Sequence, residues 1–210
     1  MNRTFMFMCI ALMGLLWLTG CSSSNGELTL SEVELTENEK LLFSTVSKDT
    51  FIFELDGQLP KGEEIKIGVD YYHFGEPQEE IEITSILTDP DPDDGFSESY
   101  ERMSIMLLEE ESETRGDFQM TMEGGGGFSS EFVLGELNTD QKSFSSGSLL
   151  ENEDMVINDE SNEKHYIAQY IIAPSSRFRT FDLEHATQPN DDYETMYLFY
   201  IQVLEPEGAE

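Results

Sequence analysis

Short runs of β-branched, aliphatic and aromatic residues recur along the chain, and nearly every run is bounded by Gly, Pro, Asn, Asp or Ser. Residues 50–55 (TFIFEL) form one such run, and in residues 65–74 (IKIGVDYYHF) every second residue from Ile65 to Tyr71 is apolar or aromatic. This alternation is typical of β-strands with one buried face. Further runs lie at residues 81–87, 103–108, 118–122, 131–137, 143–150, 166–173, 177–183 and 196–204.

About eight to ten short strands at this spacing, without a long helical period, predict an all-β protein with a single β-sandwich domain of Ig-like or jelly-roll type. We expect this domain to occupy residues 40–210. The last run, residues 196–204 (MYLFYIQVL), is apolar on both faces except at Gln202. A strand that is apolar on both faces is expected to be buried on both, which predicts that this run is a central strand.

Residues 21–39 are predicted to be an acidic tether, because small polar residues come first and are followed by acids among single apolar positions. Thr36 and Glu39 match a capping box ahead of three apolar residues, which indicates a short helical turn. A strand over residues 41–46 is an equal alternative at this point.

The amino terminus carries an uncharged apolar run at residues 5–18, preceded by Asn2 and Arg3. As a helix this run would be about 21 Å long, which is shorter than the hydrocarbon core of about 30 Å that a spanning helix must cross. A short basic region followed by an apolar run of this length is typical of a secretory signal peptide.

The residues that follow this run, Leu18, Thr19, Gly20 and Cys21, read L-T-G-C. They resemble the lipobox of bacterial lipoproteins. The resemblance implies that residues 1–20 are removed, that Cys21 carries a diacylglyceryl group and fatty acyl chains such as palmitate, and that the protein is extracytoplasmic and lipid-anchored to the bacterial cell membrane. An ordinary secretory signal with an incidental Cys21 is the alternative.

The chain is strongly acidic, with 44 Asp and Glu residues, 11 Lys and Arg residues and a formal net charge of -33. A nucleic-acid partner is not expected, because proteins that bind phosphate backbones need clustered basic residues. The acidity is consistent with a cationic or envelope partner. The acids are spread along the chain without one confined block, which favours a surface charge that keeps the protein soluble and monomeric, and we expect a monomer.

One acidic segment contains Asp89, Asp91, Asp93 and Asp94, and it is a candidate Ca²⁺ site because hard cations prefer several carboxylate oxygens. It does not match the EF-hand pattern. Asp94 stands where that pattern needs Gly, and Tyr100 stands where it needs the bidentate Glu. A solvated acidic loop is the alternative interpretation.

Arg177 and Arg179 form a close basic pair on one predicted strand, and they are candidate ligands for an anion or for a partner's carboxylate. Such residues also commonly neutralise neighbouring acids within the same protein. Tyr71, Tyr72 and Phe74 are close in sequence and could form an aromatic platform for a ligand.

No catalytic residue is assigned from the sequence. His73, His165 and His185 lack the spacing of a zinc site, and no G-x-S-x-G or phosphate-binding motif is present. The sequence therefore favours a lipid-anchored cell-envelope protein with a non-catalytic binding or structural β-sandwich. The alternatives are an envelope-turnover enzyme whose site assembles in space, and a divalent-cation-binding surface module.

Overall fold

The computed structural model describes residues 27–57, 63–78, 80–87, 101–108, 115–123, 128–136, 142–150, 154–158, 162–174 and 187–204. These residues form twelve strands and one short helix, α2 (Glu37–Phe43). The strands are β1 (Glu27–Glu32), β2 (Ser47–Gly57), β3 (Glu64–His73), β4 (Glu76–Pro77), β5 (Ile81–Leu87), β6 (Arg102–Leu108), β7 (Arg115–Glu123), β8 (Phe128–Glu136), β9 (Lys142–Ser148), β10 (Met155–Asn158), β11 (His165–Pro174) and β12 (Thr195–Leu204).

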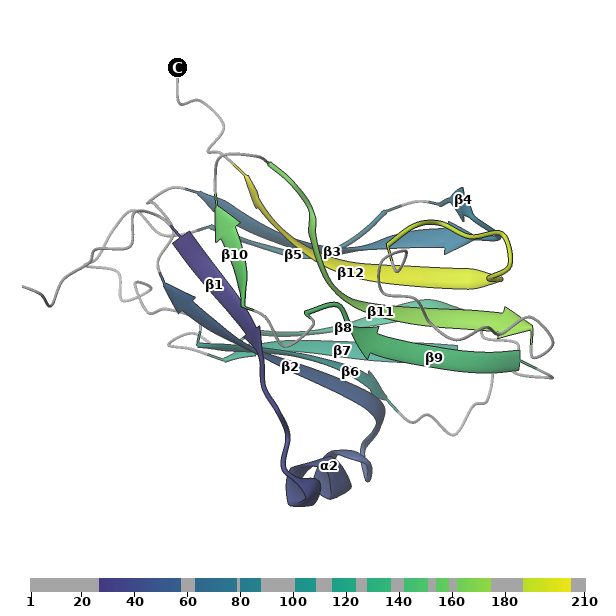
Figure 1. The fold of residues 1–210 in the computed structure, drawn as a ribbon, viewed down its shortest axis with the longest axis horizontal. Coiled ribbons are helices and arrows are strands. Elements are labelled where there is room, and N and C mark those ends of the chain that lie inside the picture. Colours follow the sequence, from purple (N-terminus) through teal and green to yellow (C-terminus); the bar gives the residue numbers. More distant parts are fainter. Residues whose placement is uncertain are drawn as a thin grey trace, which may run out of the picture.

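Two antiparallel sheets pack face to face (Figure 1). The first sheet has the strand order β10-β1-β2-β6-β7-β8. The second has the order β4-β3-β12-β11-β9, and β5 pairs with β3 on the same side as β4. This architecture confirms the predicted all-β sandwich.

The core fills the space between the sheets with apolar side chains from β1, β2, β3, β6, β7, β10, β11 and β12. Phe118 of β7 contacts both Tyr170 of β11 and Phe199 of β12 across this space, with ring centroids 5.6 Å and 5.2 Å apart. Aromatic pairs at such distances add to the stabilisation from apolar burial. The predicted alternation in β3 is confirmed, since Ile65, Ile67 and Val69 all belong to this core.

Strand β12 is central, as its two-sided apolar pattern predicts, because it pairs with β3 on one side and β11 on the other. Its inner face contributes Phe199 and Ile201 to the main core. Its outer face contributes Met196 and Leu198, which join Ile171 in a second, smaller apolar cluster. The strand is therefore buried on both faces.

The sandwich begins earlier than predicted, which corrects the tether assigned to residues 21–39 from residue 27 onward. Residues from Glu27 onward form β1, which pairs with both β2 and β10. Leu28 and Leu30 alternate with polar residues and are buried in the core, so this acid-rich stretch is a strand. The short β10 was also not predicted.

Of the two predicted alternatives for this segment, a helical turn or a strand, the structure has the helix, which is capped by Thr36. Thr36 caps α2, and its hydroxyl accepts a hydrogen bond from the backbone N–H of Glu39, while the Glu39 carboxylate accepts one from the backbone N–H of Thr36. The residues after α2 lead directly into β2, so no strand occupies residues 41–46.

Candidate functional site

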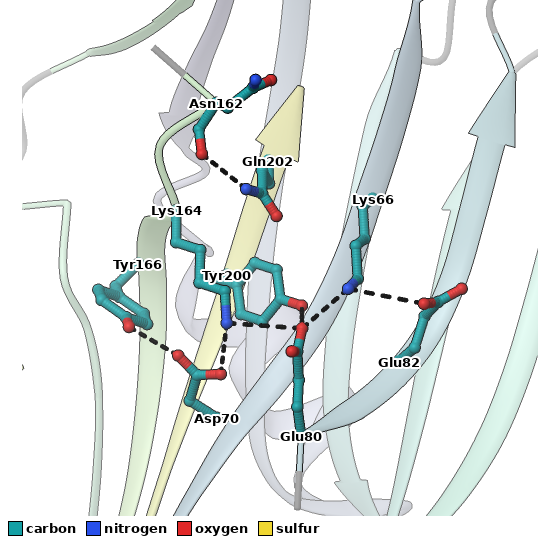
Figure 2. A network of polar contacts seen from close by, with 9 residues as sticks. All are labelled: Lys66, Asp70, Glu80, Glu82, Asn162, Lys164, Tyr166, Tyr200 and Gln202. Carbon is teal, nitrogen blue, oxygen red and sulfur yellow. Dashed lines mark hydrogen bonds and ion pairs between the residues drawn. The ribbon is translucent and has the colours of Figure 1, made fainter. Parts of the chain in front are cut away.

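A set of polar side chains joined by hydrogen bonds and ion pairs lies on the outer face of the second sheet (Figure 2). We call it the polar network and define it by its members: Lys66, Asp70, Glu80, Glu82, Asn162, Lys164, Tyr166, Tyr200 and Gln202. Strand register explains why these residues meet. Tyr166, Tyr200 and Gly68 stand opposite one another on β11, β12 and β3, and Gln202 stands opposite Lys66.

Tyr200 lies at the centre of the polar network and is fully buried. Its ring covers Gly68 so closely that a Cβ atom placed on Gly68 would lie 2.6 Å from Tyr200 Cζ. Glycine is thus required by space at this position. The Tyr200 hydroxyl donates a hydrogen bond to Oε1 of Glu80, which precedes β5.

One end of the polar network is built around Asp70 of β3. Lys164 Nζ lies 2.7 Å from Asp70 Oδ1, and the Tyr166 hydroxyl donates to Asp70 Oδ2 over 2.7 Å. Both carboxylate oxygens of this largely buried side chain are therefore engaged. Buried charges are stable when they are paired and hydrogen-bonded in this way.

The other end is built around Glu80. Lys66 Nζ lies 2.9 Å from Glu80 Oε1, and Lys66 also approaches Oε2 of Glu82 at 3.6 Å. Lys164 connects the two ends, because its Nζ is 3.5 Å from Glu80 Oε1 and 4.3 Å from the centre of the Tyr200 ring. The ammonium group over the ring adds a cation–π contact to its two ion pairs.

Four groups of the polar network have pKa values that are shifted further from neutral pH. The hydrogen bonds from Tyr200 and Lys66, with the nearby charge of Lys164, lower the pKa of Glu80 to about 2. The hydrogen bond to Glu80 raises the pKa of Lys66. Burial, together with a hydrogen bond to a carboxylate, raises the pKa of Tyr166 and of Tyr200. At neutral pH these four groups therefore keep fixed protonation states.

A pH dependence follows from Glu80. Its pKa is about 2 in the folded protein against an ordinary value of 4.5, so its stabilising contribution is present above about pH 4.5 and is lost as the pH falls towards 2. The Glu80 side chain is 39% exposed, so we expect Glu80→Gln to lower the free energy of unfolding by about 1 kcal/mol at pH 7 after solvent screening. Urea titrations of both proteins should show this difference shrinking below pH 4.5.

Glu82→Gln is the matched control for that measurement. Glu82 contacts the same lysine at the longer distance of 3.6 Å, and its side chain is 57% exposed. Exposed ion pairs contribute little, so this variant should differ from wild type by less than about 0.5 kcal/mol at any pH. A difference for Glu80→Gln that does not change between pH 7 and pH 3 would contradict the assignment.

Several residues singled out in the sequence lie outside the described residues, and their candidate roles stay predictions. They are Cys21, Asp89, Asp91, Asp93, Asp94, Arg177, Arg179 and His185. The predicted strand over residues 177–183 also lies outside them. Within the described ranges, no group of three or more His, Cys, Asp or Glu residues is arranged to hold a metal ion. The helix found there is not long and apolar enough to cross a membrane.

The aromatic platform proposed from Tyr71, Tyr72 and Phe74 does not form. Neighbouring residues of a strand point to opposite faces, so Tyr71 packs on the inner side, stacked on Tyr197 at 4.9 Å, while Tyr72 joins the outer apolar cluster. Phe74 follows β3 in a turn with a φ of 49° and is exposed. The three rings thus have three different environments.

The two described histidines differ in their surroundings. His73 is exposed at the end of β3 and packs edge-on against Phe74, with ring centroids 4.7 Å apart. His165 is half-buried at the start of β11, and its Nε2 atom is buried without a hydrogen-bond partner. His73 is therefore a sheet-surface residue, whereas His165 is a partly buried residue with one unsatisfied nitrogen.

The comparisons with known proteins identify the domain that carries the polar network. The model of the YgaN domain matches residues 29–203. The chain belongs to the YgaN domain family. The match begins within β1 and ends within β12, so the YgaN domain coincides with the sandwich and includes every member of the polar network. No curated protein and no solved structure matched the chain.

Proposed function

We propose that this YgaN domain protein is a non-catalytic binding module, anchored through acyl chains on Cys21 to the outer face of a bacterial cell membrane. The anchor is supported by the L-T-G-C sequence at residues 18–21. Two acyl chains are needed for stable anchoring, since one chain gives only marginal membrane binding.

One observation carries the non-catalytic part of the proposal: the polar network uses its charges internally. General acid–base catalysis works best when the pKa of the catalytic group lies near the operating pH. In the polar network the pKa of Glu80 is about 2, while the pKa values of Lys66, Tyr166 and Tyr200 are raised. These groups are suited to holding β3, β5, β11 and β12 together, and poorly suited to moving protons.

The strand positions also agree with a domain held close to a membrane. Five residues, 22–26, separate Cys21 from the start of β1. A stretch of six residues reaches at most about 20 Å when fully extended. The sandwich would therefore be held near the membrane by its Glu27 end.

Metabolic labelling with a radioactive or clickable fatty acid tests the anchor. We expect wild-type protein to be labelled and to sediment with membranes, while Cys21→Ala is unlabelled and is recovered in the soluble fraction or retains its signal sequence. Cys9→Ala is the control, because Cys9 lies in the segment that is removed, and it should be labelled like wild type. Absence of label on the wild type, or label that persists in Cys21→Ala, would refute the anchor.

A further inference from the structure

Helix α2 lies at the tip of the β1–β2 hairpin (Figure 1). Large apolar side chains of this tip are exposed to water. Leu41 is 69% exposed, Leu42 is 67% exposed and Val46, just after the helix, is 57% exposed. We call these three residues the apical patch. They are the most exposed large hydrophobic residues in the described part of the chain.

The helix is ordered although none of its residues is buried. Helices of this length are marginal in water, and most protein helices depend on tertiary packing. Here hydrogen bonds at both ends replace that packing. The capping box holds the start, and the hydroxyls of Ser44, Thr45 and Ser47 donate to the carbonyls of Leu41, Leu42 and Phe43 at the end, in that order.

A helix that is capped at both ends and exposes two leucines, with an exposed valine just after it, is suited to binding. Preorganisation lowers the conformational cost of association, because the surface is already ordered in the free protein. Exposed apolar residues gathered at one place mark interaction sites more often than singly scattered ones. The helix is therefore held in a conformation that keeps the apical patch available.

The charges around the apical patch indicate what it binds. Exposed glutamates precede and enter the helix at Glu32, Glu34, Glu37 and Glu39. The exposed basic residues nearby are Lys40, which pairs with Glu37 at 3.6 Å, Lys48, and Arg102, whose charge acts on Glu39, so the rim keeps an excess of acids. Such a rim favours a partner with lysines or arginines around an apolar pocket. A second copy of this chain would carry the same acidic rim, and anionic lipid headgroups would also be repelled.

The position of the tip supports a protein partner over the membrane. The Glu27 end of β1 pairs with the Gly57 end of β2, and α2 lies beyond the opposite end of the hairpin. An 11-residue strand such as β2 spans about 35 Å. If Cys21 is anchored as proposed above, the tip is held on the far side of the domain from the lipid.

We propose that the apical patch docks into an apolar pocket rimmed by basic residues on another protein of the cell envelope. The orientation argument rests on the proposed lipid anchor, whereas the exposure, the ordering and the charge of α2 do not. The binding geometry is that of a short helix whose apolar side chains enter a groove.

Photo-crosslinking in cells followed by a binding measurement tests this proposal. A photoreactive residue at position 42 of the full lipidated protein should capture a protein that the same residue at position 156 does not. Val156 is 48% exposed on β10 and is the matched control position. The captured protein is then purified, and its affinity for the detergent-solubilised lipoprotein is measured.

We expect Leu41→Ser with Leu42→Ser to raise the Kd for the captured protein at least tenfold, while Val156→Ser leaves it unchanged. Glu34→Lys with Glu37→Lys should raise the Kd several-fold and reduce its dependence on salt. These leucines are exposed, so their replacement should not unfold the domain, and circular dichroism checks this.

Four results would overturn the proposal. The first is an identical crosslinking pattern at positions 42 and 156, and the second is a Kd that the double serine variant does not change. The third is binding to phosphatidylglycerol vesicles that depends on Leu41 and Leu42. The fourth is self-association that depends on the same two leucines. Fatty-acid labelling of the same cells reports the anchor separately, so a failed docking proposal and a failed anchor give different results.

Discussion

A chain that ends at Glu194 is expected to be insoluble and to show no cooperative unfolding transition. This truncation removes β12, whose ten residues pair with β3 on one side and with β11 on the other. Its loss leaves two unpaired strand edges in the middle of the second sheet. Exposed edges of this kind promote aggregation, because they present a row of free backbone donors and acceptors.

The energetic loss is also comparable to the total stability of a single domain. The strand buries Tyr197, Phe199 and Ile201 on its inner face and Met196 and Leu198 on its outer face. Burial of each large apolar side chain contributes about 1.5–3 kcal/mol, so their summed contribution is comparable to a total stability of about 5–15 kcal/mol.

A chain that ends at Leu204 is the control, because it retains all of β12. It should be soluble and unfold cooperatively in urea, as followed by circular dichroism. A soluble and cooperatively folded product of the shorter truncation would show that the second sheet closes without β12.

Gly68→Ala is expected to destabilise the domain by about 3 kcal/mol, which is large for the addition of one methyl group. The new Cβ would lie 2.6 Å from Tyr200 Cζ and 2.9 Å from Cε1, so the ring must move. Tyr200 is fully buried, donates a hydrogen bond to Glu80 and lies beneath the ammonium group of Lys164. Its displacement therefore disturbs the whole polar network.

Two further variants distinguish this clash from a general intolerance of alanine in strands. Gly147→Ala adds a Cβ that meets only the Gln169 Nε2 atom, at an ordinary 3.8 Å, and should change stability by less than about 0.5 kcal/mol. In a Tyr200→Ala background the ring is absent, so Gly68→Ala should cost much less than in wild type. Equal costs of Gly68→Ala in the two backgrounds would rule out the clash.

The strands could be predicted where their side chains follow a simple period. Alternation from Ile65 to Tyr71 placed β3, and an apolar run on both faces placed β12 at the centre of a sheet. Strand β1 was missed because the acids around Leu28 and Leu30 give this stretch the composition of a tether. Its burial depends on pairing with β2 and β10, which no local pattern reveals.

The polar network could be predicted only in part. Strand alternation places Lys66, Gly68 and Asp70 together on the outer face of β3, opposite the apolar positions. Glu80 and Lys164, however, lie just outside strands, and Lys164 is 94 residues from its partner Asp70. Their proximity is set by the order of the strands in the sheet, so the sequence around each of them carries no signal for it.

The strand order also sets the timing of folding. The middle strand of the second sheet, β12, is the last of the described strands, and its partner β3 precedes it by more than a hundred residues. Contacts between such distant segments form slowly, because a long loop must close first. The second sheet therefore stays open until β12 has been synthesised. For a chain exported as we propose, this delay would keep it unfolded while it is threaded through a translocation channel.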